Sequence, residues 1–102
     1  MPSKSKAKGN RLETAIVKTF TEAGYECQRA WGSNGAALGE AETVDNVATI
    51  NNHRVRIQAK SRKRIAHFMK PPEGADATIL KEDRGDMLIV MPVKYLLELL
   101  RH

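Results

Sequence analysis

The stretch from Asp45 to Lys60 limits most strongly what this chain can fold into. It holds a short segment over residues 45–50 that includes Val47, Ala48 and Ile50, a polar turn over 51–53, and a segment over 54–60 in which polar and apolar residues alternate. Two short runs of this kind, joined by a tight polar turn, predict a β-hairpin. Side chains alternate between the two faces of a strand, so the second run would turn its apolar residues toward a core and its polar residues away from it.

The polar face of the second predicted strand brings an amide and a lysine together. Gln58 and Lys60 are two residues apart, so they would be neighbours on that face. Asp45, on the paired strand, can reach the same edge. A carboxylate, an amide oxygen and a lysine gathered at the end of a strand can hold Mg²⁺ and position a water. The sequence therefore favours a site for phosphodiester hydrolysis at this edge.

Each polar group at this edge has an expected role. Asp45 would supply a carboxylate ligand, Gln58 an amide oxygen, and the backbone carbonyl of Ala59 a third oxygen. Lys60 would orient the attacking water and stabilise charge on the phosphate, because a lysine is a poor base near neutral pH unless its pKa is depressed. Glu13, if near, would add a further carboxylate to the metal.

An amphipathic helix is predicted over residues 10–23, where apolar residues recur at helical spacing. Asn10 can cap its start and Gly24 can close its end. Glu13 lies three residues after Asn10, in the capping-box position. A helix-start role and a metal-site role are therefore both open for Glu13.

The remaining segments complete an α/β pattern. The sequence predicts strands over 25–31, 45–50, 54–60, 75–80 and 87–91, a second helix over 61–69, a last helix from Pro92, and a glycine-rich loop over 32–42. The order α-β-β-β-α-β-β-α indicates an α/β fold with a mixed β-sheet flanked by helices. Because residues 87–91 are continuously apolar, we expect that strand to be central and covered on both faces.

Positive charge is concentrated in the first part of the chain. The net charge is +5, but residues 1–70 hold thirteen Lys or Arg and six Asp or Glu, whereas residues 71–102 hold four and six. An excess of positive charge favours a polyanionic partner. Residues 54–64 include six basic residues and no acidic one. A solvated face would explain this run, but its position on both sides of Lys60 favours a DNA track.

Residues 1–9 predict a flexible basic arm, followed by a single nuclease-like domain over 10–102. The arm would be either a solubilising tail or a contact for phosphates. The residues expected to contact DNA are Lys4, Lys6, Lys8, Arg11, Arg29, Arg54, Arg56, Arg62, Lys63 and Arg64.

Simple counts exclude several classes of protein. The single cysteine, Cys27, leaves no intrachain disulfide framework and no cysteine-based zinc site. No run of about 18 apolar residues exists, so no membrane span is expected. The lysines near the N-terminus are not followed by an apolar segment, so a secretory signal is not expected. These features favour the cytoplasm.

The same residues resemble the PD-(D/E)XK nuclease superfamily and, within it, the archaeal-type Holliday junction resolvases. The likeness covers roughly residues 8 to 100 and lies in Lys8-Gly9, Glu13, Gly24-Tyr25, Arg29 to Ser33, Val44-Asp45-Asn46-Val47-Ala48, Gln58-Ala59-Lys60-Ser61 and the segment Asp83 to Val90. It implies a restriction-endonuclease-like fold. It also implies a homodimer that cuts four-way DNA junctions with Mg²⁺ or Mn²⁺. Small nucleases of this kind also occur in phages, so a bacterial, archaeal or phage-infected cell is expected.

The resemblance assigns roles to individual positions. It makes Glu13, Asp45 and Gln58 metal-site residues, Lys60 the catalytic lysine, and Ser33 a catalytic-loop residue near the scissile phosphate. Two positions depart from the family pattern. Val44 stands where a proline is usual, and Gln58 stands where a glutamate is usual, although some branches of the superfamily carry glutamine there.

Two further functions are open beside the nuclease. One is a DNA-binding module that kept the fold and lost catalysis, with Gln58 as the sign of that loss. The other is a basic α/β domain that binds RNA or a protein. Metal-dependent nicking of DNA separates the nuclease from both.

Overall fold

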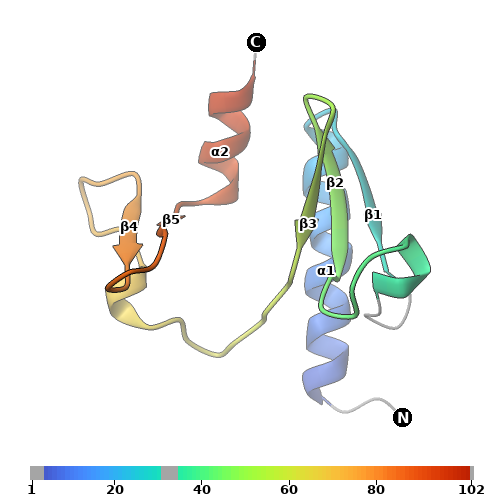
Figure 1. The fold of residues 1–102 in the computed structure, drawn as a ribbon, viewed down its shortest axis with the longest axis horizontal. Coiled ribbons are helices and arrows are strands. Elements are labelled where there is room, and N and C mark those ends of the chain that lie inside the picture. Colours follow the sequence, from blue (N-terminus) through green and yellow to red (C-terminus); the bar gives the residue numbers. More distant parts are fainter. Residues whose placement is uncertain (1–3, 31–34, 102) are drawn as a thin grey trace. The chain divides into compact units, whose positions relative to one another are not determined.

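The computed structural model describes residues 4–30 and 35–101 and divides the chain into two compact units, one ending at Ser61 and one beginning at Arg62. Figure 1 shows the elements of each unit. Since each unit packs within itself, each is described on its own.

The first unit is a three-stranded antiparallel sheet with one helix on it. The helix α1 (Lys4–Glu22) is followed by the strands β1 (Glu26–Arg29), β2 (Asn46–Ile50) and β3 (His53–Ile57), which lie in the order β1-β2-β3. α1 contacts β1 and β2 and runs along one face of the sheet (Figure 1). The buried apolar side chains between these elements are Phe20, Cys27, Ala30, Val44, Val47 and Ala48.

The predicted hairpin is present and its turn explains why. Ile50 pairs with His53, so Asn51 and Asn52 form a two-residue loop, and both have positive φ values of 51° and 70°. Two-residue hairpin loops need this left-handed backbone, and asparagine tolerates it better than most residues. The turn chemistry therefore fixes the register that pairs Asn46 with Ile57.

The helix α1 ends as predicted but begins earlier. Gly24, at φ 93°, donates its N–H to the Thr21 carbonyl at 3.0 Å, and Tyr25 donates to the Phe20 carbonyl at 3.0 Å. This pair of bonds closes the helix at a glycine, as the sequence predicted. The start at Lys4 instead of Asn10 is a difference, because the helix continues into the stretch expected to be an arm. The division into an arm and a single domain stays a prediction.

The second unit contains a two-stranded antiparallel sheet and a short helix. A 3₁₀ turn, η3 (His67–Met69), precedes β4 (Thr78–Lys81), β5 (Met87–Val90) and α2 (Val93–Leu100). β4 and β5 pair with Ile79 opposite Ile89. α2 starts directly after Pro92, which fits the preference of proline for helix starts.

Two predictions for the second unit are wrong. Residues 61–69 form only the three-residue turn η3 instead of a helix. The apolar face expected for this helix is not buried, since Ile65 is 54% and Phe68 is 71% exposed, and a short helix without a packed face is marginal. β5 has β4 as its one strand neighbour among residues 35–101, and Leu88 is 64% exposed, so it is not a covered central strand. An apolar run favours burial, but it does not supply a second neighbour.

The fold class itself is confirmed. The mixture of helices with strands in the order predicted around the hairpin is consistent with a restriction-endonuclease-like fold. The strand predicted over 54–60 is wrong at its end, because β3 stops at Ile57 and leaves Gln58 and Lys60 beyond the strand. Ile57 and Ala59 are half-buried as expected, but Val55 stays exposed. β3 therefore buries its apolar face only toward the end that leads to Gln58.

Candidate active site

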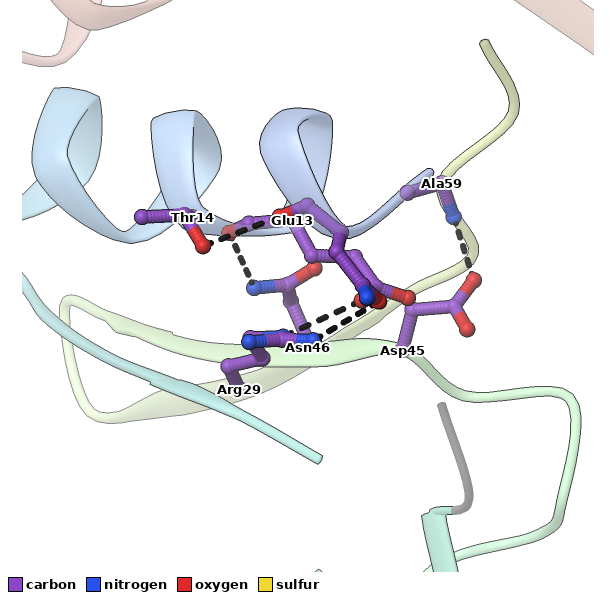
Figure 2. Close-up of polar contacts among 7 residues, drawn as sticks. Glu13, Thr14, Arg29, Asp45, Asn46 and Ala59 are labelled. Atoms are coloured by element: carbon purple, nitrogen blue, oxygen red, sulfur yellow. Dashed lines mark hydrogen bonds and ion pairs between the residues drawn. The ribbon is translucent and has the colours of Figure 1, made fainter. Parts of the chain in front are cut away.

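Asp45 lies against the segment that follows β3. Its backbone N–H donates to the Ile57 carbonyl at 2.8 Å, and its carboxylate Oδ2 accepts the N–H of Ala59 at 2.7 Å. Figure 2 shows this carboxylate turned toward Ala59. Gln58 and Lys60 flank Ala59, and both are exposed whereas Asp45 is only 8% exposed. A buried acid is thus fixed beside the backbone of the segment that carries the amide and the lysine.

Glu13 is a buried residue of α1, and its carboxylate forms an ion pair with Arg29. The Nε atom of Arg29 lies 3.1 Å from Glu13 Oε2, and Glu13 is 3% exposed. The other arm of the guanidinium donates from Nη2 to Asn10 Oδ1 at 2.8 Å. The capping-box interpretation of Glu13 is wrong, because α1 begins six residues before Asn10 and Glu13 is interior to the helix.

Asn46 connects these two acids through α1 and β2. It directly follows Asp45 and is 0% exposed, and its Nδ2 donates to the backbone carbonyl of Glu13 at 3.1 Å. Figure 2 shows Asn46 between β2 and the helix. The sequence interpretation gave Asn46 no separate role. The available signal was a polar residue within a run of otherwise apolar strand positions.

Two arginines of β3 share one glutamate. Arg54 forms an ion pair with Glu40 through Nε and donates from Nη2 to the Leu38 carbonyl at 2.8 Å. Arg56 Nη1 lies 3.7 Å from the other oxygen of Glu40. The carboxylate of Glu40 is therefore engaged by both arginines. It attaches the 3₁₀ turn η2 (Gly35–Leu38) and the residues after it to β3.

The other predicted DNA contacts are distributed over both units. Lys4, Lys6, Lys8 and Arg11 belong to α1, and Arg11 is exposed. Arg62, Lys63 and Arg64 are exposed at the start of the second unit. Arg29 takes part in the ion pair with Glu13 and is 25% exposed. Ser33 lies outside the described residues.

A sequence model of the family described as archaeal Holliday junction resolvase (hjc) matches residues 4–94 of the chain. This match includes Asp45, Ala59 and the whole hairpin between them. The chain belongs to the archaeal Holliday junction resolvase family. The family is of the PD-(D/E)XK nuclease type, so the resemblance drawn from the motifs is confirmed. Searches of curated protein sequences and of solved structures found no significant match.

Family membership indicates a resolvase-like nuclease that binds DNA. Among the described residues, no helix is long and apolar enough to cross a membrane. Burial raises the pKa of the Cys27 thiol, which lies in the core on β1. The raised pKa disfavours the thiolate, which is the reactive form of the side chain.

The side chains predicted to hold the metal carry oxygen donors, which suit a hard divalent cation. Asp45 and Glu13 carry carboxylates, and Gln58 carries an amide, so the available ligands are all oxygens. Mg²⁺ and Mn²⁺ prefer such ligands, whereas zinc sites use nitrogen and sulfur more often. Over the described ranges, no three His, Cys, Asp or Glu side chains gather closely enough to hold a metal.

Proposed function

We propose that this protein is a metal-dependent endonuclease that hydrolyses phosphodiesters in four-way DNA junctions. The observation that carries the proposal is the 2.7 Å hydrogen bond from the Ala59 N–H to Asp45. It supports the convergence of the acid with the Gln58–Lys60 segment in a member of a resolvase family. The roles below follow from that arrangement.

The metal would be held by Asp45, with Gln58 and Glu13 contributing oxygens. Bound there, Mg²⁺ or Mn²⁺ would polarise the scissile phosphate and lower the pKa of a water. The Ala59 N–H orients the Asp45 carboxylate. This carboxylate would therefore lose little conformational entropy when it binds a cation. The ion pair with Arg29 holds the Glu13 side chain in one direction within the helix face.

Lys60 supplies positive charge at the reacting phosphate. Its side chain is exposed and follows Ala59 directly, so a phosphate near Asp45 would be within reach of the ammonium group. There it would orient the attacking water and stabilise the charge that develops on the pentavalent phosphorus. Ser33 would act from the loop near the same phosphate, as the resemblance implies.

DNA would be bound by the basic residues of α1, β3 and the segment after Lys60. These contacts are with phosphates, so they position the nucleic acid without reading its sequence. Preference for a four-way junction would follow from the arrangement of two active sites in a homodimer, which the resemblance implies. Light scattering tests the dimer, with an expected mass of twice the 11.4 kDa of one chain.

The direct test incubates the protein with a four-way junction and with a linear duplex of matched sequence, in Mg²⁺, Mn²⁺ or EDTA. We expect nicking of the junction in both metals, weaker cutting of the duplex, and no product in EDTA. Cutting that is equally fast in EDTA would contradict a metal-dependent mechanism.

A second candidate function is a DNA-binding module without catalysis. The glutamine at position 58 favours it, because one amide and two carboxylates bind Mg²⁺ more weakly than three carboxylates. In that case the protein would bind the junction and leave it intact at every metal concentration. Restored cutting in Gln58→Glu would then identify the glutamine as the cause.

A further inference from the structure

Asn46 is a polar side chain in the centre of the first unit. It lies on β2, the middle strand, between Arg29 of β1 and Ile57 of β3, and it is the one large side chain below 2% exposure among the described residues. The residues that follow it on β2, Val47 and Ala48, are buried and apolar. An amide at this place therefore requires a reason other than strand packing.

The nitrogen and the oxygen of the Asn46 amide differ in their hydrogen bonding. Nδ2 donates to the Glu13 carbonyl at 3.1 Å, whereas Oδ1 is buried with no hydrogen-bond partner among the residues that the structure describes. An unpaired buried acceptor costs more free energy than one neutral hydrogen bond contributes. An apolar side chain of the same branching would bury a similar area without that cost. The amide is thus not explained by stability.

The bond from Asn46 does have a geometric consequence at the site. A carbonyl oxygen has two lone pairs, so Glu13 can accept this bond while remaining part of the helix. The bond joins the backbone of Glu13 on α1 to Asn46, the first residue of β2, which directly follows Asp45 (Figure 2). It therefore sets how far α1 stands from β2 at the level of both carboxylates.

We propose that Asn46 is a positioning residue, whose amide ties the Glu13 backbone to β2 and so sets the spacing between the Glu13 and Asp45 carboxylates. The proposal rests on the proposed function of this site. Asn46 acts through the two acids and does not touch DNA. Its loss would impair metal binding and turnover and leave junction affinity and folding intact.

The test variant is Asn46→Leu, which keeps the branching of the side chain and removes the hydrogen bond. Four quantities are measured: the melting temperature, Mn²⁺ binding without DNA by electron paramagnetic resonance, junction affinity in EDTA, and the single-turnover cleavage rate. We expect an equal or higher melting temperature and unchanged junction affinity. Mn²⁺ affinity and cleavage rate should fall by about tenfold or more, because a misplacement of about 1 Å can cost about 100-fold in rate.

The matched control is Phe20→Leu, which trims a buried side chain of the same helix seven residues after Glu13. It should lower the melting temperature while Mn²⁺ affinity and cleavage rate stay at wild-type values. If leucine at position 46 is too large for the fold, Asn46→Val is smaller and equally unable to donate. The same losses of metal affinity and rate are expected for it.

Wild-type Mn²⁺ affinity and cleavage rate in a folded Asn46 variant would overturn the proposal, as would a loss confined to junction binding. If the wild-type protein binds Mn²⁺ but cuts no DNA, the proposed function fails, and the comparison of Mn²⁺ affinities still decides the role of Asn46. If the wild-type protein binds no Mn²⁺, both proposals are overturned.

Discussion

In the proposed site, Gln58 would limit how strongly a metal ion binds. It is exposed beside Ala59, whose N–H holds the Asp45 carboxylate, and it offers a neutral oxygen where the family resemblance places a glutamate. A neutral ligand reduces the charge that attracts a divalent cation. The protein should therefore need a higher concentration of Mg²⁺ than a site with three carboxylates.

Exchange of this one residue tests that reasoning. Gln58→Glu should lower the Mg²⁺ concentration for half-maximal junction cleavage by on the order of tenfold, or about 1.4 kcal/mol of binding free energy. A titration of cleavage rate against Mg²⁺ measures it. Complete loss of cleavage in this variant would show that the amide has a role that a carboxylate cannot fill.

Cys27 gives a second prediction for a single residue. Burial raises the pKa of its thiol, so the neutral form is favoured in the folded protein. The stability that this contributes is present at low pH and is lost as pH rises through the raised pKa. Since the thiolate is the reactive form, a thiol reagent at pH 7 should modify Cys27 slowly in the native protein and rapidly in denaturant. Equal rates in both conditions would contradict its burial.

The contact between Asp45 and the segment after β3 follows from the hairpin that the sequence predicted. The turn at Asn51 and Asn52 sets the register of β2 and β3, which brings Asp45 beside Ala59. The contacts of Asn46 with Glu13 and of Glu40 with Arg54 could not be predicted in this way, because each joins segments that no tight turn connects. Neither contact leaves a periodic signal in the sequence.

At the level of elements, Glu40 neutralises part of the basic strand β3. Its carboxylate lies against Arg54 and Arg56, and its side chain is 14% exposed while those of the arginines are 50% and 64% exposed. The arginines can therefore approach a phosphate only in competition with this carboxylate. Glu40 should weaken DNA binding by β3 and hold η2 in place when DNA is absent.

Glu40→Gln should raise affinity for duplex DNA by about fivefold at most, because exposed ion pairs are worth about 0.2–1 kcal/mol. The matched control is Glu42→Gln, which changes the net charge equally at an exposed position two residues away. Titration of both variants by fluorescence anisotropy compares them. Equal gains in affinity would mean that only net charge matters and that the ion pairs with β3 do not.

Elements were predicted well where turn or cap chemistry is local. The glycine closing α1 and the asparagines of the β2–β3 turn each fixed one boundary. The helix expected over 61–69 is absent because its apolar residues Ile65 and Phe68 stay exposed, and a helix this short needs a packed apolar face to be stable. The apolar composition of β5 predicted a buried strand, but its side chains are exposed. Burial depends on what packs against a strand, which composition alone does not give.

At the scale of the whole molecule, the charge distribution governs association with DNA. Residues 1–70 carry thirteen of the seventeen basic residues, and these include every predicted DNA contact. Binding that depends on phosphate contacts releases counterions from DNA. Affinity should therefore respond strongly to salt whichever DNA structure is bound.

A plot of the logarithm of the binding constant against the logarithm of salt concentration measures this. Each phosphate neutralised contributes a slope of about −0.9, so a track engaging at least three phosphates gives about −2.7 or steeper. The measurement is made in EDTA to separate binding from cleavage. A flat response would show that the basic residues do not form a DNA track.

Asp45 and the Gln58–Lys60 segment are proposed to form one metal-dependent catalytic site. The most direct test compares junction cleavage by Asp45→Asn with that of the wild-type protein, with junction binding measured in parallel. The asparagine oxygen can still accept the Ala59 N–H, so the fold and DNA affinity should persist. Cleavage should fall by about 100-fold or more, as for the loss of one charged contact to a transition state. Full cleavage by Asp45→Asn would place the active site elsewhere.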